Sequence, residues 1–213
     1  MFENEKNSLI KTCRDISAKK LTVATWGNVS LRVSENKFLI TPSGMDYNSL
    51  IPEDIVLMDF EENIIEGSKK PSVEYFMHLC IYRNRKDINA VIHTHAVFST
   101  AFALNRIPVP PVAEEMIQII GEEIQCADYG LPGSRQLGEN VAAALGNNFA
   151  VLMASHGAVC VGKDFQHALK ISEVLEKTCQ TIIYAKILGN PYIIPHEECE
   201  AMIDFTKNKY GQK

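Results

Sequence analysis

Two histidines separated by one residue give the first indication of chemistry in this chain. His93-Thr94-His95 directly follows the apolar run Ala90-Val91-Ile92, which is typical of a buried β-strand. On a strand, residues i and i+2 project from the same face, about 6–7 Å apart at their Cα atoms, so both imidazoles can reach one metal ion. The same spacing also occurs in pairs of packed, hydrogen-bonded histidines, and the motif alone leaves both interpretations open.

A third histidine favours the metal interpretation. His156 follows the apolar segment Ala150–Met153 and precedes Gly157, a residue that lets the backbone approach its neighbours closely. Three imidazoles with one open coordination position form the donor set of a catalytic zinc centre. The sequence therefore predicts that His93, His95 and His156 meet at one site.

The other three histidines are weaker candidates. His78 and His167 fall inside predicted amphipathic helices, where a packed or solvated imidazole is the usual finding. His196 follows a proline at the start of a predicted helix, and we expect it to be exposed.

Glu74 is a carboxylate with two interpretations. It lies in the first turn of a helix predicted from Pro71 to about Arg85, with Ser72 as the N-cap. The helix dipole favours a negative charge at that position, which is a sufficient structural reason for it. The chemical alternative is a fourth metal ligand or a general base beside the histidines.

Small hydroxyl residues and glycines gather in three further places, Thr25–Asn28, Thr41–Gly44 and Ser72. Backbone N–H groups in glycine turns, hydroxyls and a helix N-terminus can together hold a phosphate group without a basic cluster. Each segment alone is also an ordinary turn. The phosphate interpretation therefore depends on their combination with the histidines.

The charge balance limits the classes of partner. Among 213 residues, 21 Lys and Arg against 26 Asp and Glu give a net charge of −5, with 46% apolar and 22% charged residues. This balance argues against broad binding to nucleic acid or to an anionic membrane surface, because both need a basic face. No apolar run approaches the ~20 residues that span a bilayer, and residues 1–18 contain no signal-peptide core. We expect a cytoplasmic protein with no nucleic-acid and no membrane partner.

The six cysteines are scattered along the chain without a CxxC pair. A chain of this size can bury a sufficient core without disulfides, and thiols stay reduced in the cytoplasm. We therefore expect buried free thiols.

The elements that must position these side chains alternate between strands and helices. No linker or repeat divides the sequence, so we predict one domain over residues 1–213 with a mixed or antiparallel sheet and helices on both faces. The expected strands are 29–33 and 37–40 as a hairpin, then 55–60, 89–94, 122–128 and 150–153. The expected helices are 2–20, 71–85, 96–104, 134–145, 164–188 and 197–207.

Five short motifs in register resemble the class II aldolase/adducin-head family, and the likeness runs from the first helix to the tail. Within that family the chain is most similar to the zinc-dependent L-fuculose-1-phosphate aldolases. The motifs are Gly27-Asn28-Val29-Ser30-Leu31-Arg32, Ile40-Thr41-Pro42-Ser43-Gly44, Pro71-Ser72-Val73-Glu74, Val91-Ile92-His93-Thr94-His95-Ala96 and Ser155-His156-Gly157.

The resemblance implies a fold, an assembly and a set of site residues. The fold is α/β, with a mostly antiparallel central sheet covered by helices on both faces. The assembly is a cyclic homotetramer with one Zn²⁺, or another divalent ion, per subunit at the subunit interfaces. The resemblance assigns zinc ligation to His93, His95 and His156, fourth-ligand and acid/base roles to Glu74, phosphate binding to Gly27, Asn28, Ser43, Gly44 and Ser72, and proton donation to Tyr210.

Two positions depart from the family pattern. Val73 stands where the fuculose enzymes carry a second serine, so one hydroxyl to the phosphate is missing. Glu114-Glu115 stands where those enzymes place an aromatic donor. We therefore expect a substrate other than L-fuculose 1-phosphate, with Glu115 or Tyr210 serving the C4 oxygen, in either case from a neighbouring subunit.

The expected activity is reversible cleavage of a ketose 1-phosphate to dihydroxyacetone phosphate and an aldehyde. Three alternatives use the same scaffold: a sugar-phosphate 4-epimerase, a methylthioribulose-1-phosphate dehydratase and a tetronate-phosphate decarboxylase. A more distant alternative is a non-catalytic interaction module like the adducin head. Such a module should lack the histidines and the glutamate, which this chain contains.

Overall fold

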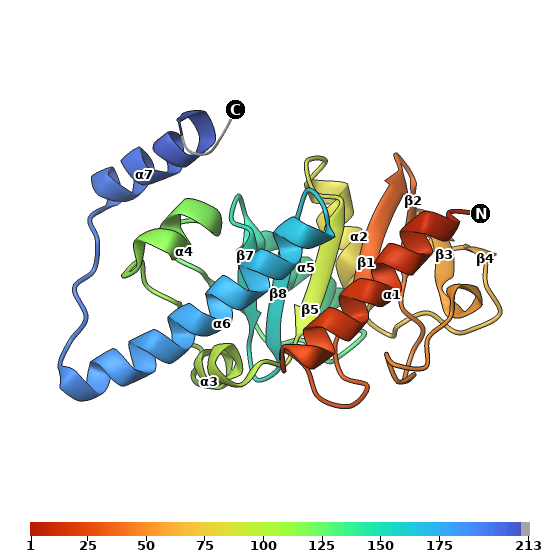
Figure 1. Cartoon of the computed structure of the whole chain (residues 1–213), viewed down its shortest axis with the longest axis horizontal. Coiled ribbons are helices and arrows are strands. Elements are labelled where there is room, and N and C mark those ends of the chain that lie inside the picture. The colour runs from red at the N-terminus through yellow and green to blue at the C-terminus, as the bar shows by residue number, and fades with distance from the viewer. Residues whose placement is uncertain (210–213) are drawn as a thin grey trace.

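The computed structural model describes residues 1–209, in which one eight-stranded sheet forms the centre of the molecule (Figure 1). The strand order is β4-β3-β2-β1-β5-β8-β7-β6. Every neighbouring pair is antiparallel except β6 and β7, which are parallel. The strands are β1 (Asn28–Ser34), β2 (Lys37–Ile40), β3 (Val56–Asp59), β4 (Ile64–Glu66), β5 (Ala90–Thr94), β6 (Cys126–Ala127), β7 (Ala150–Met153) and β8 (Gly157–Gly162).

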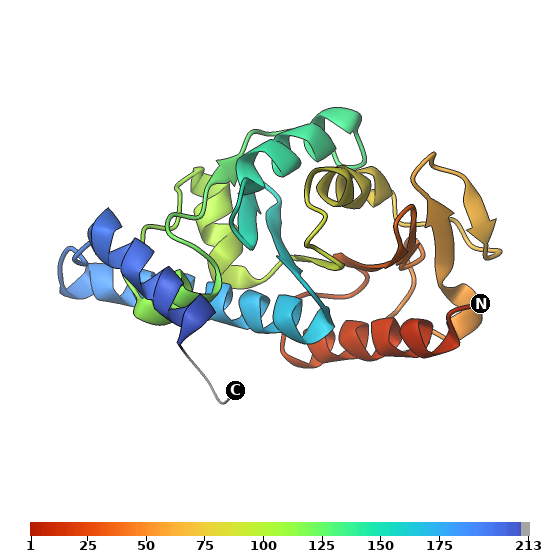
Figure 2. The same cartoon turned by 90° about the horizontal axis from the view of Figure 1, so that it is seen from above.

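Helices cover both faces of this sheet, as Figure 2 shows, with α1 and α6 on one side and α2 and α5 on the other. The α/β fold with a mostly antiparallel, helix-covered sheet is therefore confirmed. The helical elements are α1 (Glu3–Ala18), the 3₁₀ turn η1 (Pro52–Asp54), α2 (Tyr75–Asn84), α3 (Val97–Asn105), α4 (Glu114–Ile119), α5 (Arg135–Leu145), α6 (Phe165–Leu188) and α7 (His196–Asn208).

The central strands are apolar on both faces because both faces are covered. In β5, Val91 packs toward α2 and α5, whereas Ala90 and Ile92 pack toward α1. All five residues of β5 are buried. Burial on both sides explains why the sequence shows a continuous apolar run here instead of the alternation of a half-exposed strand.

The helix predicted from Pro71 begins later, at Tyr75, with Glu74 as its N-cap residue. The backbone before it is held by another segment: Pro71 bridges to Pro42, and the Ser72 N–H donates to the Thr41 carbonyl at 2.9 Å. The Ser72 hydroxyl accepts from the Glu74 N–H at 3.3 Å. The prediction of Ser72 as N-cap was therefore wrong, because these residues pair with residues 41–42 instead of starting the helix.

Three elements were not anticipated from the sequence pattern: β4, β8 and α4. β8 lies between β5 and β7 and is fully buried, but its small and apolar residues carry no helical or alternating period. The strand predicted over 122–128 is reduced to the two residues of β6.

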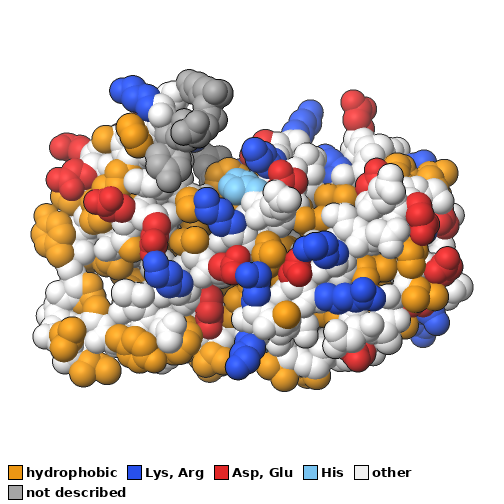
Figure 3. All heavy atoms as spheres, viewed as in Figure 1, with side chains coloured by type: hydrophobic (Ala, Val, Ile, Leu, Met, Phe, Trp, Pro, Cys, Tyr) orange, Lys and Arg blue, Asp and Glu red, His pale blue; other side chains and the backbone are white. Residues whose placement is uncertain are grey.

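The thiols and the surface charges agree with the sequence analysis. All six cysteines are free, as predicted; five are buried, whereas Cys126 is only partly buried. On the face drawn in Figure 3, basic and acidic side chains are interspersed. Among residues 1–209 no helix has the length and apolar character needed to cross a bilayer.

A partly buried carboxylate fixes the segment that follows β5. Helix α3 has no side-chain cap of its own. Instead, the Glu176 carboxylate of α6 accepts hydrogen bonds from the N–H groups of Phe98 (2.8 Å) and Ser99 (2.9 Å) and from the Ser99 hydroxyl (2.9 Å). Glu176 thus satisfies the free N–H groups of α3 and anchors the chain just after His95.

Replacing Glu176 by Gln should lower the free energy of unfolding by about 1–2 kcal/mol, because an amide cannot accept all three hydrogen bonds. The measurement is urea denaturation followed by circular dichroism at fixed protein concentration. The control is Glu173→Gln on the same helix, where the carboxylate pairs with Lys19 at an exposed position and the midpoint should not move. Equal midpoints for the two variants would contradict this role for Glu176.

Candidate metal centre and substrate cavity

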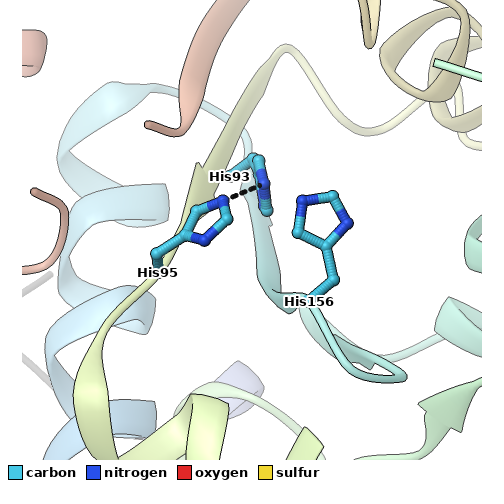
Figure 4. Close-up of side chains that lie close together, drawn as sticks. All are labelled: His93, His95 and His156. Atoms are coloured by element: carbon cyan, nitrogen blue, oxygen red, sulfur yellow. Dashed lines mark hydrogen bonds between the residues drawn. The ribbon is translucent and has the colours of Figure 1, made fainter. Parts of the chain in front are cut away.

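Three histidines from two segments of the chain converge at one end of the central strands (Figure 4). His93 lies on β5, His95 follows the end of that strand, and His156 lies in the turn between β7 and β8. Because β8 pairs with β5, with Val159 opposite His93, the β7–β8 turn brings His156 to the end of β5. The candidate ligand atoms all lie within 4.8 Å of one another.

Two glycines make this convergence sterically feasible. A Cβ at Gly157 would collide with the Thr94 carbonyl oxygen, so only glycine lets the β7–β8 turn meet the end of β5. Gly27 has φ +82°, and a Cβ there would lie 2.6 Å from the His93 carbonyl oxygen. Both glycines are therefore explained by close backbone approach to the histidine segment.

Hydrogen bonds orient two of the rings. The His93 Nδ1–H donates to the Ala158 carbonyl at 2.9 Å, which leaves the Nε2 lone pair directed at the other rings. His95 Nε2 lies 2.9 Å from that Nε2, so the two nitrogens point at the same place. A backbone carbonyl on one imidazole nitrogen with the other nitrogen free is the usual arrangement of a metal-ligating histidine.

Two of the imidazoles, those of His95 and His156, are held in the neutral form that metal binding requires. Burial, with His93 close by, lowers the pKa of His95 to about 3 and that of His156 to about 4. At neutral pH each ring therefore has a lone pair to offer.

Glu74 completes the cluster from the start of α2. Its Oε2 lies 3.3 Å from His93 Nε2 and accepts from Asn28 Nδ2 at 2.8 Å. Its Oε1 lies 3.5 Å from His156 Nε2 and is buried without a hydrogen-bond partner. Burial alone would raise the pKa of this carboxyl, but the adjacent His93 and His156 and the Asn28 hydrogen bond outweigh burial and lower it.

This donor set fits a divalent transition-metal ion. Three imidazoles supply nitrogen ligands, and Glu74 Oε1, which has no hydrogen-bond partner among the described residues, supplies a buried anionic oxygen that needs a positive neighbour. Nitrogen and carboxylate donors with room for a further ligand are typical of catalytic zinc sites and also suit other first-row ions.

The residues predicted to bind phosphate line a cavity of about 220 Å³ that also reaches the histidines. Ser43 and Gly44 lie exposed at its rim, and Ser72 is buried. No lysine or arginine is among its lining residues. The described lining consists of Thr25, Trp26, Gly27, Asn28, Pro42, Ser43, Gly44, Ser72, Val73, Glu74, His95, Pro132 and His156.

Asn28 lines this cavity, as expected, and also has contacts within the protein. Its side chain faces this cavity but is hydrogen-bonded at both ends within the protein, with Nδ2 to Glu74 Oε2 and Oδ1 to His78 Nε2. The structure therefore places the Asn28 amide in the support of Glu74.

His78 is the site-associated residue that sequence reasoning missed. It is fully buried on α2 and hydrogen-bonded to Asn28 and Ser30. The available signal was the spacing Glu74–His78, which places the two side chains one turn apart on the same helix face.

Of the two residues expected to serve the C4 oxygen, Glu115 is not among the residues that line this cavity. Glu115 lies on α4 at the surface, where its carboxylate pairs with Lys177 at 2.6 Å. Tyr210 lies outside the described residues.

A second, more open cavity of about 340 Å³ adjoins the histidines on the side away from Ser43 and Gly44. Trp26, Tyr129 and Pro132 form its apolar walls, with His95 and His156 at its base. The Trp26 and His95 ring centroids are 5.6 Å apart. This cavity offers apolar surface directly beside the candidate metal centre.

Comparison with known proteins gives consistent results. Residues 7–183 match the family model described as Class II Aldolase and Adducin N-terminal domain. The chain is 31% identical to 5-deoxy-D-ribulose 1-phosphate aldolase of Bacillus thuringiensis serovar kurstaki, over 100% of both chains. It is 34% identical to L-fuculose phosphate aldolase of Escherichia coli O6:H1, over 97% of each. A solved structure of an L-fuculose 1-phosphate aldolase superposes with a TM-score of 0.94 at 36% identity, covering 97% of this chain and 98% of that one. The resemblance seen in the motifs is thereby confirmed.

Replacing His95 by Ala should abolish stoichiometric metal binding, because it removes one of three converging imidazoles. After loading with Zn²⁺ and gel filtration, elemental analysis should find about one ion per chain in the unsubstituted protein and only background in the variant. His167→Ala, a histidine on α6 outside the cluster, is the control and should retain the metal. Full metal content in His95→Ala would contradict the assignment.

Proposed function

This chain belongs to the class II aldolase and adducin N-terminal domain family, and we propose that it is a zinc-dependent aldolase. The proposed reaction is reversible cleavage of a ketose 1-phosphate to dihydroxyacetone phosphate and an aldehyde. Relatives named as aldolases cover the whole chain, which indicates a lyase. The observation that carries the proposal is Glu74 Oε1, which has no hydrogen-bond partner among the described residues and lies beside three converging imidazoles where the two cavities meet.

The proposed ligands are His93, His95 and His156, with Glu74 as the fourth in the resting site. When bound, a divalent ion supplies Lewis-acid polarisation of the substrate's C2 carbonyl. Glu74 then transfers the proton that C3 receives. As the C3–C4 bond breaks, its electron pair moves toward C3 and C2. Glu74, ionised in the resting site, would take up the C3 hydroxyl proton as the substrate binds and deliver it to C3, and the proton lost from the C4 hydroxyl would restore the C3 hydroxyl, giving dihydroxyacetone phosphate and the aldehyde.

The C4 hydroxyl must lose its proton in the same cleavage, so that the C4–O bond becomes the aldehyde carbonyl. No carboxylate other than Glu74 is among the described residues that line the two cavities. We propose that Tyr210 or Glu115 of a neighbouring subunit accepts this proton, in a homotetramer whose active sites lie at subunit interfaces. The surface position of Glu115 suits a contribution to another subunit.

The phosphate of the substrate is proposed to lie in the 220 Å³ cavity, at Ser43, Gly44, Ser72 and the turn at Gly27. Hydroxyls and backbone N–H groups are the donors there. Because no lysine or arginine lines this cavity, the charge of the substrate is balanced by oriented dipoles and by the metal ion.

The aldehyde half is proposed to occupy the second cavity, between Trp26 and Tyr129. These side chains are 63% and 49% exposed, so they present open apolar surface beside the metal centre. Apolar walls favour an aldehyde that ends in a methyl or similar group over a polyhydroxylated one. One of the relatives is named for a 5-deoxy pentulose phosphate, which supports the same substrate class.

Replacing Glu74 by Gln should lower kcat for cleavage by about 10²–10⁴-fold, because an amide cannot carry the proton to C3. The measurement is dihydroxyacetone phosphate release from 5-deoxyribulose 1-phosphate, by a coupled assay with Zn²⁺ present. Glu139→Gln, at an exposed position on α5, is the matched control and should be fully active.

NMR of the products separates the aldolase from the alternatives on the same scaffold. Cleavage gives two fragments, whereas an epimerase, a dehydratase or a decarboxylase gives an epimer, a dehydrated product or carbon dioxide. Turnover without dihydroxyacetone phosphate, or no turnover of any ketose 1-phosphate tried, would contradict the proposal.

Trp26→Ala should remove the preference for an apolar aldehyde. In the condensation direction, the unsubstituted protein should use acetaldehyde better than glycolaldehyde by about 10-fold, the value of one small apolar contact. The variant should lose this ratio, and Trp26→Phe should keep most of it. An equal loss of kcat/KM for both aldehydes in Trp26→Ala would place the aldehyde elsewhere.

A further inference from the structure

A chain of buried hydrogen bonds leads from Glu74 into the interior of the protein. Asn28 Nδ2 donates to Glu74 Oε2 at 2.8 Å, and His78 Nε2 lies 2.5 Å from Asn28 Oδ1. Ser30 Oγ lies 2.6 Å from His78 Nδ1 and 2.7 Å from the Tyr82 hydroxyl. All of these side chains are buried, and His78 and Ser30 have no exposed surface.

The repeats of an α-helix and of a β-strand explain how these hydrogen-bonded side chains come together. Glu74, His78 and Tyr82 are four residues apart, so they lie along one face of α2. Asn28 and Ser30 are two apart on β1, so they project from one face of the strand. The facing rows interlock in the order Glu74, Asn28, His78, Ser30, Tyr82.

In this series of hydrogen bonds, each residue donates toward the Glu74 end. An ionised carboxylate only accepts, so Asn28 presents its NH₂ group to Glu74 and its carbonyl oxygen to His78. His78 must then donate from Nε2. The neutral ring has its lone pair on Nδ1, where it accepts from the Ser30 hydroxyl. Burial, with His93 close by, lowers the pKa of His78 to about 3, which is consistent with this neutral ring.

We propose that His78 is a positioning residue for Glu74. Its Nε2–H fixes the Asn28 amide in the orientation that donates to Glu74 Oε2. That anchor holds one carboxylate oxygen and leaves the other, Oε1, free beside His156 for the metal ion. If the Asn28 amide were flipped, its Oδ1 would face Glu74 Oε2. Two acceptors would then repel each other, and the Glu74 carboxylate would lose this position. The inference rests on the proposed function only for the step at C3; the effect on metal binding is independent of it.

Two substitutions at His78 distinguish a role in positioning Glu74 from a role in packing alone. The amide nitrogen of a glutamine reaches the place of histidine Nε2, whereas the shorter asparagine amide stands near Nδ1. His78→Gln therefore keeps a donor for Asn28, and His78→Asn keeps only a partner for Ser30. Both are neutral and polar, so they differ mainly in the contact that the proposal invokes.

The experiment measures Zn²⁺ affinity by competition with a chromophoric chelator, and separately kcat and KM for cleavage. His78→Asn should bind Zn²⁺ about 10–100-fold more weakly, as expected for loss of support to a ligand. Its kcat should fall with little change in KM. His78→Gln should stay close to the unsubstituted protein in both. Equal weakening in the two variants, or unchanged Zn²⁺ affinity in both, would overturn the proposal.

A second pair of variants covers the case in which His78→Asn does not fold. Ser30→Ala removes the donor that holds the His78 tautomer, and it should also weaken Zn²⁺ binding. Ser172→Ala removes another buried serine hydroxyl, which donates to the Ala168 carbonyl of its own helix and is not part of the hydrogen bonds that lead to Glu74, and it should have no effect. Equal Zn²⁺ affinities for these two variants would overturn the proposal. Absence of cleavage by the unsubstituted protein would instead contradict the proposed function, while the metal titrations would still decide the role of His78.

Discussion

A buried carboxylate oxygen without a hydrogen-bond partner is the constraint on which the rest of this site depends. Glu74 Oε1 lies beside His156, enclosed by protein and paired with no donor. A buried anion is costly unless a charge or a hydrogen bond compensates it. The pKa values of the neighbouring His95 and His156 are lowered to about 3 and about 4, so these two rings carry no positive charge at neutral pH to compensate it. The arrangement is satisfied by a cation placed between the carboxylate and the rings, and the donors match one.

The fold provides this constraint by joining three rigid parts. The β5–β8 pairing brings His156 to the end of the strand that carries His93. The packing of α2 against the sheet places Glu74 over the same point, and β1 supplies Asn28 as its anchor. Groups held on strands and helices that are packed on both faces keep their geometry better than groups on loops. The more exposed parts of the cavities, at Ser43, Gly44 and Trp26, lie where substrates of different shape must be accepted.

The same arrangement accounts for an anionic substrate in an acidic chain. The net charge of −5 carries no information about the 220 Å³ cavity, whose described lining residues include no lysine or arginine. Under the proposed function, a metal ion, hydroxyls and oriented N–H groups would supply the binding potential there. The family relationship makes a sugar phosphate the natural substrate class. The apolar walls of the second cavity limit the range of aldehydes proposed to bind there.

Local patterns predicted most of the elements and the convergence of the histidines, because short apolar runs followed by His-containing turns mark strand ends. They did not predict β8, whose residues lack a period, or the late start of α2, which depends on pairing between residues 41–42 and 71–72. The role of His78 was also hidden, because a histidine inside a helix looks alike whether it is packed passively or bonded to Asn28. Such features depend on which segments meet in space, and sequence spacing does not encode this directly.

We propose that three imidazoles and the Glu74 carboxylate hold a single metal ion. X-ray absorption spectroscopy of the Zn²⁺-loaded protein tests it most directly. We expect a first shell of nitrogen and oxygen atoms at about 2.0–2.2 Å from the zinc ion, with outer-shell scattering from three imidazoles. A shell that contains sulfur, or an all-oxygen shell without imidazole scattering, would contradict it.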